Sequence, residues 1–132
     1  SSVAIAPVTS GGVVDLDALA ELVGPGTALV SVMTVNNEVG TRQPIAAVAE
    51  VLRARAPQAL LHTDAVQAPT WVGPDAYAAA DLVSVTGHKV GGLRGTRARK
   101  TRQGAGACEQ SPAPQKHSPV QQAIARCRFS TL

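Results

Sequence analysis

The sequence is poor in aromatic residues and in cysteine. Its 132 residues include one Trp, one Tyr, one Phe and two cysteines, and 45% of them are hydrophobic. A core must therefore be built from Val, Leu, Ile and Ala. No apolar run reaches the roughly 18 residues that a membrane-spanning helix needs. The first residues carry no basic region and no signal-peptide pattern, so we expect a cytoplasmic protein without a membrane partner.

The net charge of +3 conceals two unlike parts of the chain. Residues 1–96 hold five basic and eight acidic residues, whereas residues 97–132 hold seven basic residues and one acidic residue. The second part also contains both cysteines and is rich in Gln. We therefore predict a folded part over 1–96 and a basic tail over 97–132. The tail is interpreted as disordered, or as a frameshifted or misjoined reading of the coding sequence.

The order of apolar and amphipathic segments predicts an α/β fold. Strands are predicted at 3–8, 28–35, 59–63 and 81–86, and helices after Asp15, from Pro44 and within 75–80. The run 28–35 is continuously apolar, which is typical of a strand buried on both faces of a parallel sheet. Alternating strands and helices imply βαβ units, and therefore a mostly parallel sheet with flanking helices.

Polar residues follow three of the predicted strands. Asn37 follows the second strand, Asp64 and Gln67 follow the third, and His88 and Lys89 follow the fourth. Ligands of open parallel sheets bind beyond the carboxyl ends of the strands. We therefore expect these side chains to converge on one rim of the sheet.

Three segments resemble the signature blocks of class V aminotransferase-like enzymes, which use pyridoxal phosphate (PLP). They are SVMTVNNEVGTRQPI (31–45), LLHTDAVQA (60–68) and DLVSVTGHKVGG (81–92), and the opening VAIAPVTSGGVVDLDAL (3–19) is similar to the segment before these blocks. The resemblance is closest to cysteine desulfurases and selenocysteine lyases. It covers about residues 1–96 and implies part of the large domain of a fold type I PLP-dependent transferase.

The resemblance implies a catalytic role for Lys89 and a cofactor-binding role for Asp64. Lys89 would form the Schiff base with PLP and would move protons at the α-carbon of the substrate. Asp64 would pair with the pyridinium nitrogen, and a protonated ring nitrogen keeps the ring an electron sink.

Five further residues receive cofactor contacts from the same resemblance. Asn37 and Gln67 would contact the phenolic oxygen, and Val66 would pack against a face of the ring. Thr86 and His88 would hydrogen-bond the phosphate. No metal is expected at this site.

Several of these residues also have a purely structural interpretation. Asp64 is suited to cap a helix, and Asn37 is suited to a turn. Asn36 and Glu38 are expected to organise their loop rather than to contact the cofactor. His62, which precedes Asp64 on the same strand, is interpreted as a packed, hydrogen-bonded residue and not as a catalyst.

The activity that the resemblance implies is that of a cysteine desulfurase. Such an enzyme converts L-cysteine to L-alanine and holds the sulfur as a persulfide. It works as a homodimer and passes the sulfur to an acceptor protein for iron–sulfur cluster assembly or thiolation. Selenocysteine lyase or another class V aminotransferase-like enzyme remains the alternative, because the blocks present here bind cofactor rather than sulfur or selenium.

The sequence departs from the family in ways that favour two rival interpretations. It lacks the upstream phosphate loop, the histidine that stacks on the ring and the C-terminal domain with the sulfur-accepting cysteine. Cys108 has none of the flanking residues of that cysteine. One rival is therefore an inactive fragment with weak or absent PLP binding. The other is a nucleic-acid binder acting through the basic tail, against which the lack of aromatic stacking residues argues.

Overall fold

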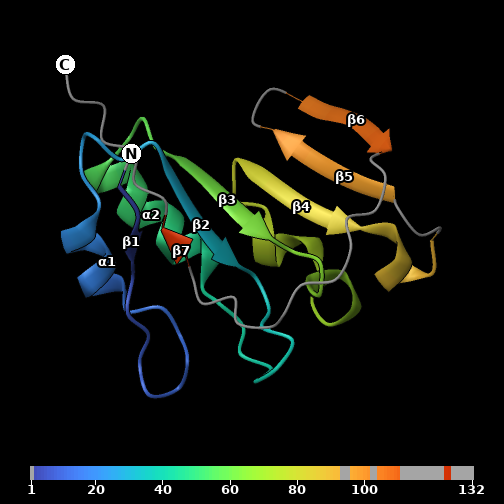
Figure 1. Ribbon diagram of the computed structural model, residues 1–132, viewed down its shortest axis with the longest axis horizontal. Coiled ribbons are helices and arrows are strands. Elements are labelled where there is room, and N and C mark those ends of the chain that lie inside the picture. The colour runs from blue at the N-terminus through green and yellow to red at the C-terminus, as the bar shows by residue number, and fades with distance from the viewer. Residues whose placement is uncertain (1, 93–95, 102–103, 111–123, 126–132) are drawn as a thin grey trace.

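The structure, a computed structural model, describes residues 2–92, 96–101, 104–110 and 124–125. Its helices are α1 (Leu16–Leu22) and α2 (Ile45–Arg55), and its short 3-10 helices are η1 (Ala68–Thr70), η2 (Pro74–Tyr77) and η3 (Gly87–Val90). Its strands are β1 (Ala4–Ile5), β2 (Leu29–Met33), β3 (Leu60–Asp64), β4 (Leu82–Thr86), β5 (Thr96–Thr101), β6 (Gly104–Gln110) and β7 (Ile124–Ala125). The main sheet has the order β2-β3-β4-β5-β6, and β1 pairs with β7 apart from it (Figure 1).

The centre of the main sheet is parallel. Strands β2, β3 and β4 run in the same direction, whereas β5 runs antiparallel to β4 and β6 antiparallel to β5. The register places Met33 beside Asp64 and Asp64 beside Ser84, so the three strands end at one edge. The predicted α/β class, with parallel strands and flanking helices, is confirmed.

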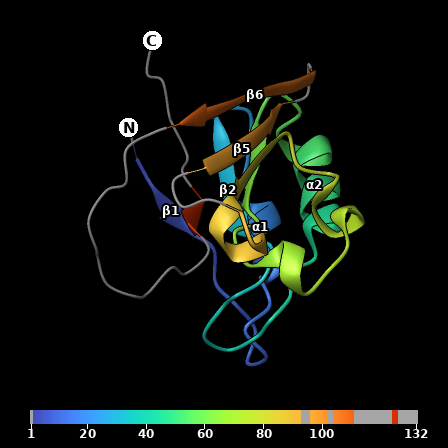
Figure 2. The same ribbon diagram turned by 90° about the vertical axis from the view of Figure 1, so that its right-hand side faces the viewer.

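One face of the parallel strands supplies most of the core. Alternate residues of β2 are buried, namely Val30 and Val32, while Leu29, Ser31 and Met33 are half-buried. The prediction of a strand buried on both faces is therefore wrong. The physical reason is that α1 and α2 lie together and share one core with the buried residues of the strands (Figure 2). That core contains Leu19, Val30, Val32, Ile45, Val48, Ala49, Leu52, Leu61 and Val83.

The helix starts follow local chemistry. Asp15 is the N-cap of α1, and its Oδ1 accepts hydrogen bonds from the backbone N–H groups of Asp17 and Ala18, both at 3.1 Å. This confirms the predicted cap, which satisfies two otherwise unpaired helix donors. Pro44 occupies the N-cap of α2 rather than its first helical position. The helix predicted within 75–80 is the 3-10 helix η2, shifted toward Pro74.

The chain after β4 contains strands that the hydrophobic pattern of the sequence did not predict. Strands β5 and β6 extend the main sheet through residues 96–110, and β7 lies further along at residues 124–125. The rest of the predicted tail, over 102–103, 111–123 and 126–132, lies outside the described residues. None of the described helices is both long enough and apolar enough to cross a bilayer.

Replacing the cap of α1 tests the account of this helix. We expect Asp15→Ala to lower the free energy of unfolding by about 1 kcal/mol, because two backbone donors lose their acceptor. Urea denaturation of the wild type and the variant measures the difference. Asp15→Ser retains a capping oxygen and serves as the control. Equal losses in Asp15→Ala and Asp15→Ser would show that the cap is not the cause.

Candidate functional site

A cavity opens beyond the carboxyl ends of β2 and β3. Its volume is about 400 Å³, and its polar and aromatic lining comprises Asn36, Asn37, Arg42, Gln67 and Trp71. The asparagines and Arg42 come from the loop between β2 and α2, while Gln67 and Trp71 flank η1. Two residues predicted to contact a cofactor, Asn37 and Gln67, therefore share one cavity.

Asp64 is the last residue of β3 and is half-buried. Its Oδ1 accepts a hydrogen bond from the backbone N–H of Val66 at 2.9 Å. The side chain thus caps the turn that leads into η1, which fixes one carboxylate oxygen relative to the backbone. Val66 and Gln67, two and three residues further on, are both half-buried in this turn.

The end of β4 carries the remaining predicted residues. Thr86 Oγ1 and His88 Nδ1 share a hydrogen bond of 2.8 Å. Lys89 lies in η3 and is exposed. Gly91 ends η3 with a φ of +81°, a left-handed conformation that favours glycine. The backbone N–H of Gly92 then donates to the carbonyl of Gly87 at 2.8 Å, which closes the turn around Lys89.

The structure brings two pairs of the predicted residues together at one edge of the sheet. Asn37 and Gln67 share the cavity, and Thr86 and His88 share a hydrogen bond. Asp64 and Lys89 do not line the cavity. The elements η1 and η3 contact each other, so the turns that follow β3 and β4 are neighbours.

The sequence patterns did not single out Arg42 or Trp71, which also line the cavity. Trp71 is 78% exposed, although it is the only tryptophan of the chain. The signal that could have found both residues is their position in the segments that follow β2 and β3. Within the described part of the chain, no three His, Cys, Asp or Glu side chains gather as metal ligands would.

His62 joins the three parallel strands on the partly covered face of the sheet. Its Nδ1 shares a hydrogen bond of 2.7 Å with Ser31 Oγ on β2, and its Nε2 shares one of 2.9 Å with Ser84 Oγ on β4. The predicted packing and hydrogen bonding of His62 are therefore confirmed. Burial lowers the pKa of His62 below its ordinary value of 6.5, and the negative charge of Asp64 opposes this shift in part.

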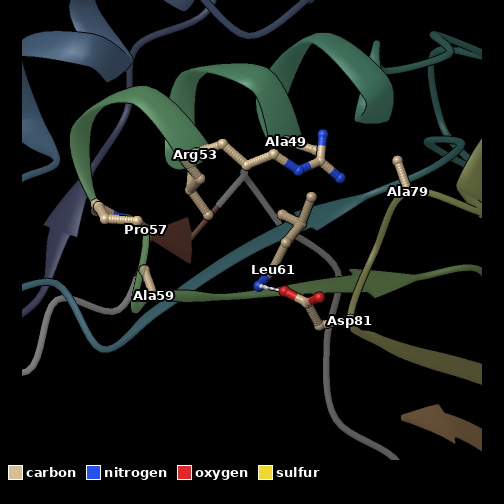
Figure 3. A pocket seen from close by; sticks show the side chains of 9 residues that line it. Ala49, Arg53, Pro57, Ala59, Leu61, Ala79 and Asp81 are labelled. Atoms are coloured by element: carbon tan, nitrogen blue, oxygen red, sulfur yellow. Dashed lines mark hydrogen bonds between the residues drawn. The ribbon is translucent and has the colours of Figure 1, made fainter. Parts of the chain in front are cut away.

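A second pocket lies at the opposite, amino-terminal edge of the strands (Figure 3). It sits under the end of α2 and holds only about 10 Å³, room for a single water molecule. Buried Asp81 lies beside it and accepts a hydrogen bond from the backbone N–H of Leu61 at 2.9 Å. The pocket is thus a packing feature of the strand starts and is too small for a cofactor.

Comparison with known proteins identifies the class of enzyme. The family model of class V aminotransferases matches residues 1–103, most of the chain. The chain therefore belongs to the class V aminotransferase family, whose members use PLP. The match extends seven residues beyond residue 96, where the resemblance in the sequence was expected to end.

Several proteins that resemble this chain are named cysteine desulfurases. The mitochondrial cysteine desulfurase of Drosophila melanogaster is 44% identical over 93 residues, which are 70% of this chain and 20% of that protein. The structure of DndA from Streptomyces lividans aligns with a TM-score of 0.64 and 39% identity, covering 74% of this chain and 26% of DndA. A NifS-like protein aligns with a TM-score of 0.70 and 34% identity, covering 96% and 33% of the respective chains. The chain thus spans a fifth to a third of these relatives.

The histidine that bridges the strands gives a prediction about pH. The lowered pKa means that the unfolded chain takes up a proton before folded His62 does. The stability that neutral His62 contributes is complete above about pH 6.5, and it is lost as the pH falls through the lowered folded value.

We therefore expect the free energy of unfolding to fall less between pH 7.5 and pH 5.5 in His62→Gln than in the wild type. Urea denaturation at each pH measures this slope. The titration of Asp and Glu carboxylates contributes equally to both slopes, because both chains contain the same carboxylates. The exposed His88, replaced by Gln in the same way, controls for the loss of an imidazole. Parallel curves for His62→Gln and the wild type would contradict the prediction.

Proposed function

We propose that this chain forms the cofactor-binding central part of a PLP-dependent cysteine desulfurase. The observation that carries the proposal is the alignment of three parallel strand ends, with the side-chain amides of Asn36, Asn37 and Gln67 lining one cavity. Membership of a PLP-dependent family and the similarity to cysteine desulfurases support it.

The chemistry of the donor set at this edge fits PLP. The carboxylate of Asp64 suits a protonated pyridine nitrogen, and the amides of Asn37 and Gln67 suit a phenolic oxygen. Hydroxyl and imidazole groups, such as those of Thr86 and His88, are donors that a phosphate accepts. A ring-sized ligand also fits within the volume of about 400 Å³.

When bound, PLP supplies an electron sink that loosens bonds at the α-carbon of an amino acid. The chain's own residues would prepare this chemistry. The amine of Lys89 would hold the cofactor covalently and then carry the proton at the α-carbon. The carboxylate of Asp64 would hold the proton on the ring nitrogen, and Val66 would pack against the ring.

The proposed reaction converts L-cysteine to L-alanine and leaves the sulfur as a persulfide on a cysteine of the whole protein. Cysteine as substrate follows from the names of the relatives. The homodimer, the sulfur-acceptor protein, iron–sulfur cluster assembly and the cytoplasmic setting belong to the same proposal. Selenocysteine lyase remains the second candidate, because the cofactor blocks are compatible with both substrates.

Covalent labelling tests the role of Lys89. The chain has three lysines, Lys89, Lys100 and Lys116. After incubation with PLP and reduction with borohydride, we expect peptide mass spectrometry to find the pyridoxyl group on Lys89. The label should disappear in Lys89→Ala and persist in Lys116→Ala. An equal distribution over the three lysines would contradict the assignment and would favour the inactive-fragment interpretation.

A second substitution separates the two roles of Asp64. Asn retains a capping oxygen but removes the negative charge. We therefore expect Asp64→Asn to leave the urea midpoint close to that of the wild type. The PLP concentration for half-saturation should rise about tenfold or more, because a charged hydrogen bond to the ring nitrogen is lost. Absorbance of bound cofactor measures saturation, and unchanged affinity would leave Asp64 with its capping role alone.

A further inference from the structure

The loop that carries Asn37 is closed at its base by backbone contacts. This cavity loop, residues 34–43, begins as β2 ends and leads to α2. Val35 and Arg42 form an antiparallel bridge, and the N–H of Gln43 donates to the carbonyl of Thr34 at 2.9 Å. The cavity loop therefore leaves the sheet and returns to the same point.

The interior of the cavity loop is also ordered by its own groups. Asn36 Oδ1 accepts hydrogen bonds from the N–H groups of Glu38 at 2.8 Å and Val39 at 3.1 Å. The N–H of Asn36 donates to the carbonyl of Thr41 at 2.9 Å, and the N–H of Gly40 donates to the carbonyl of Asn36 at 3.0 Å. These bonds fix the shape of the cavity loop but not its position relative to the rest of the molecule.

The side chain of Gln43 supplies a link from the cavity loop to a distant segment. It is only 5% exposed. Its Nε2 donates to the carbonyl of Gly12 at 2.7 Å, and its Oε1 accepts from the N–H of Val14 at 2.8 Å. The partners are 31 and 29 residues away in sequence. One amide thus satisfies a donor and an acceptor of the same distant backbone, a pairing that fixes the orientation of the amide.

The segment that hydrogen-bonds to Gln43 is itself held in place. Residues 8–14 form a hairpin, closed by a bridge between Val8 and Val14 and by a hydrogen bond from the N–H of Thr9 to the carbonyl of Val13 at 2.8 Å. Directly after it, Asp15 caps α1. Gly12 turns with a φ of +74°, and a Cβ there would lie 3.1 Å from Thr41 Oγ1. The 8–14 hairpin and the cavity loop therefore approach closely, at a point where only glycine fits well.

We propose that Gln43 is a positioning residue for the candidate cofactor site. Its amide hydrogen-bonds the cavity loop to the 8–14 hairpin, and this link determines where Asn37 and Arg42 lie at the cavity. This inference rests on the proposed function, because the position of Asn37 matters to the cofactor only if the cavity receives it. Gln43 itself does not line the cavity and acts through the cavity loop.

Amide hydrogen exchange, followed by NMR on the full chain, tests the link. Gln43→Met has a similar length but no hydrogen-bonding amide. We expect the amide of Val14 to exchange faster in Gln43→Met, and those of Asn36 and Gly40 to exchange about tenfold faster as well. Gln58→Met, at an exposed site three residues after the end of α2, is the matched control and should change none of the three exchange rates. Faster exchange at Val14 alone would overturn the proposal, since Gln43 would then only stabilise the hairpin.

Gln43→Glu gives a reversible version of the same test. At neutral pH the carboxylate cannot donate to the carbonyl of Gly12, so we expect fast exchange at Asn36 and Gly40. Once protonated, the carboxyl can both donate and accept, as the amide does. Burial of the side chain raises the pKa of this carboxyl, because burial disfavours the charged form. As the pH is lowered, we therefore expect exchange at Asn36 and Gly40 to return toward the wild-type rate measured at the same pH. Exchange that stays fast in acid would overturn the proposal.

Titration with PLP then separates this inference from the proposed function. Trp71 is the only tryptophan and lines the cavity, so quenching of its emission reports occupancy. We expect Gln43→Met to need several-fold more PLP for half-quenching, at a temperature where circular dichroism shows both chains folded. Equal affinities despite a loosened cavity loop would overturn this inference alone. A wild type that neither quenches with PLP nor takes the label on Lys89 would overturn the proposed function as well.

Discussion

The parallel register of β2, β3 and β4 is the constraint on which the rest of the site depends. It sets Met33, Asp64 and Ser84 in one row, so that everything following these residues emerges at the same edge. His62, two residues before Asp64 on β3, ties the three strands together through its hydrogen bonds to Ser31 on β2 and Ser84 on β4. A shift of one residue would turn each of these polar side chains to the helix-covered face, where burial without partners is costly.

Buried hydrogen bonds extend the fixed arrangement of the strands into the loops that follow them. Thr34 and Thr63 are fully buried and share a hydrogen bond of 2.8 Å between their hydroxyls. The N–H of Thr34 also donates to the carbonyl of Asp64 at 2.8 Å. The cavity loop therefore starts from a point that is fixed against β3, and Gln43 fixes its return. Since an unpaired buried polar group costs more than a pair gains, such bonds select one arrangement rather than merely adding stability.

The sequence predicted what local chemistry determines. Strands β2, β3 and β4 follow from their apolar, β-branched runs, and the start of α1 follows from Asp15. It could not predict which face of β2 stays partly open, because that depends on what packs there and not on the strand. The sequence also did not predict the linking role of Gln43, since its partners are about thirty residues away. The sequence also did not predict β5 and β6, for a related reason. β5 pairs with β4 and β6 pairs with β5, so the sheet orders a segment that has no hydrophobic periodicity of its own.

Asp64 shows why the structural and the functional interpretations of one residue need not compete. The cap of its turn uses one oxygen, which accepts from Val66. An ionised carboxylate has two oxygens and about four acceptor positions, so the cap leaves capacity for a second, charged partner. The cap in fact helps such a role, because it holds the carboxylate in one orientation at the end of β3. Preorganised charge of this kind interacts more strongly with a ligand than a freely rotating side chain does, since no further ordering is needed on binding.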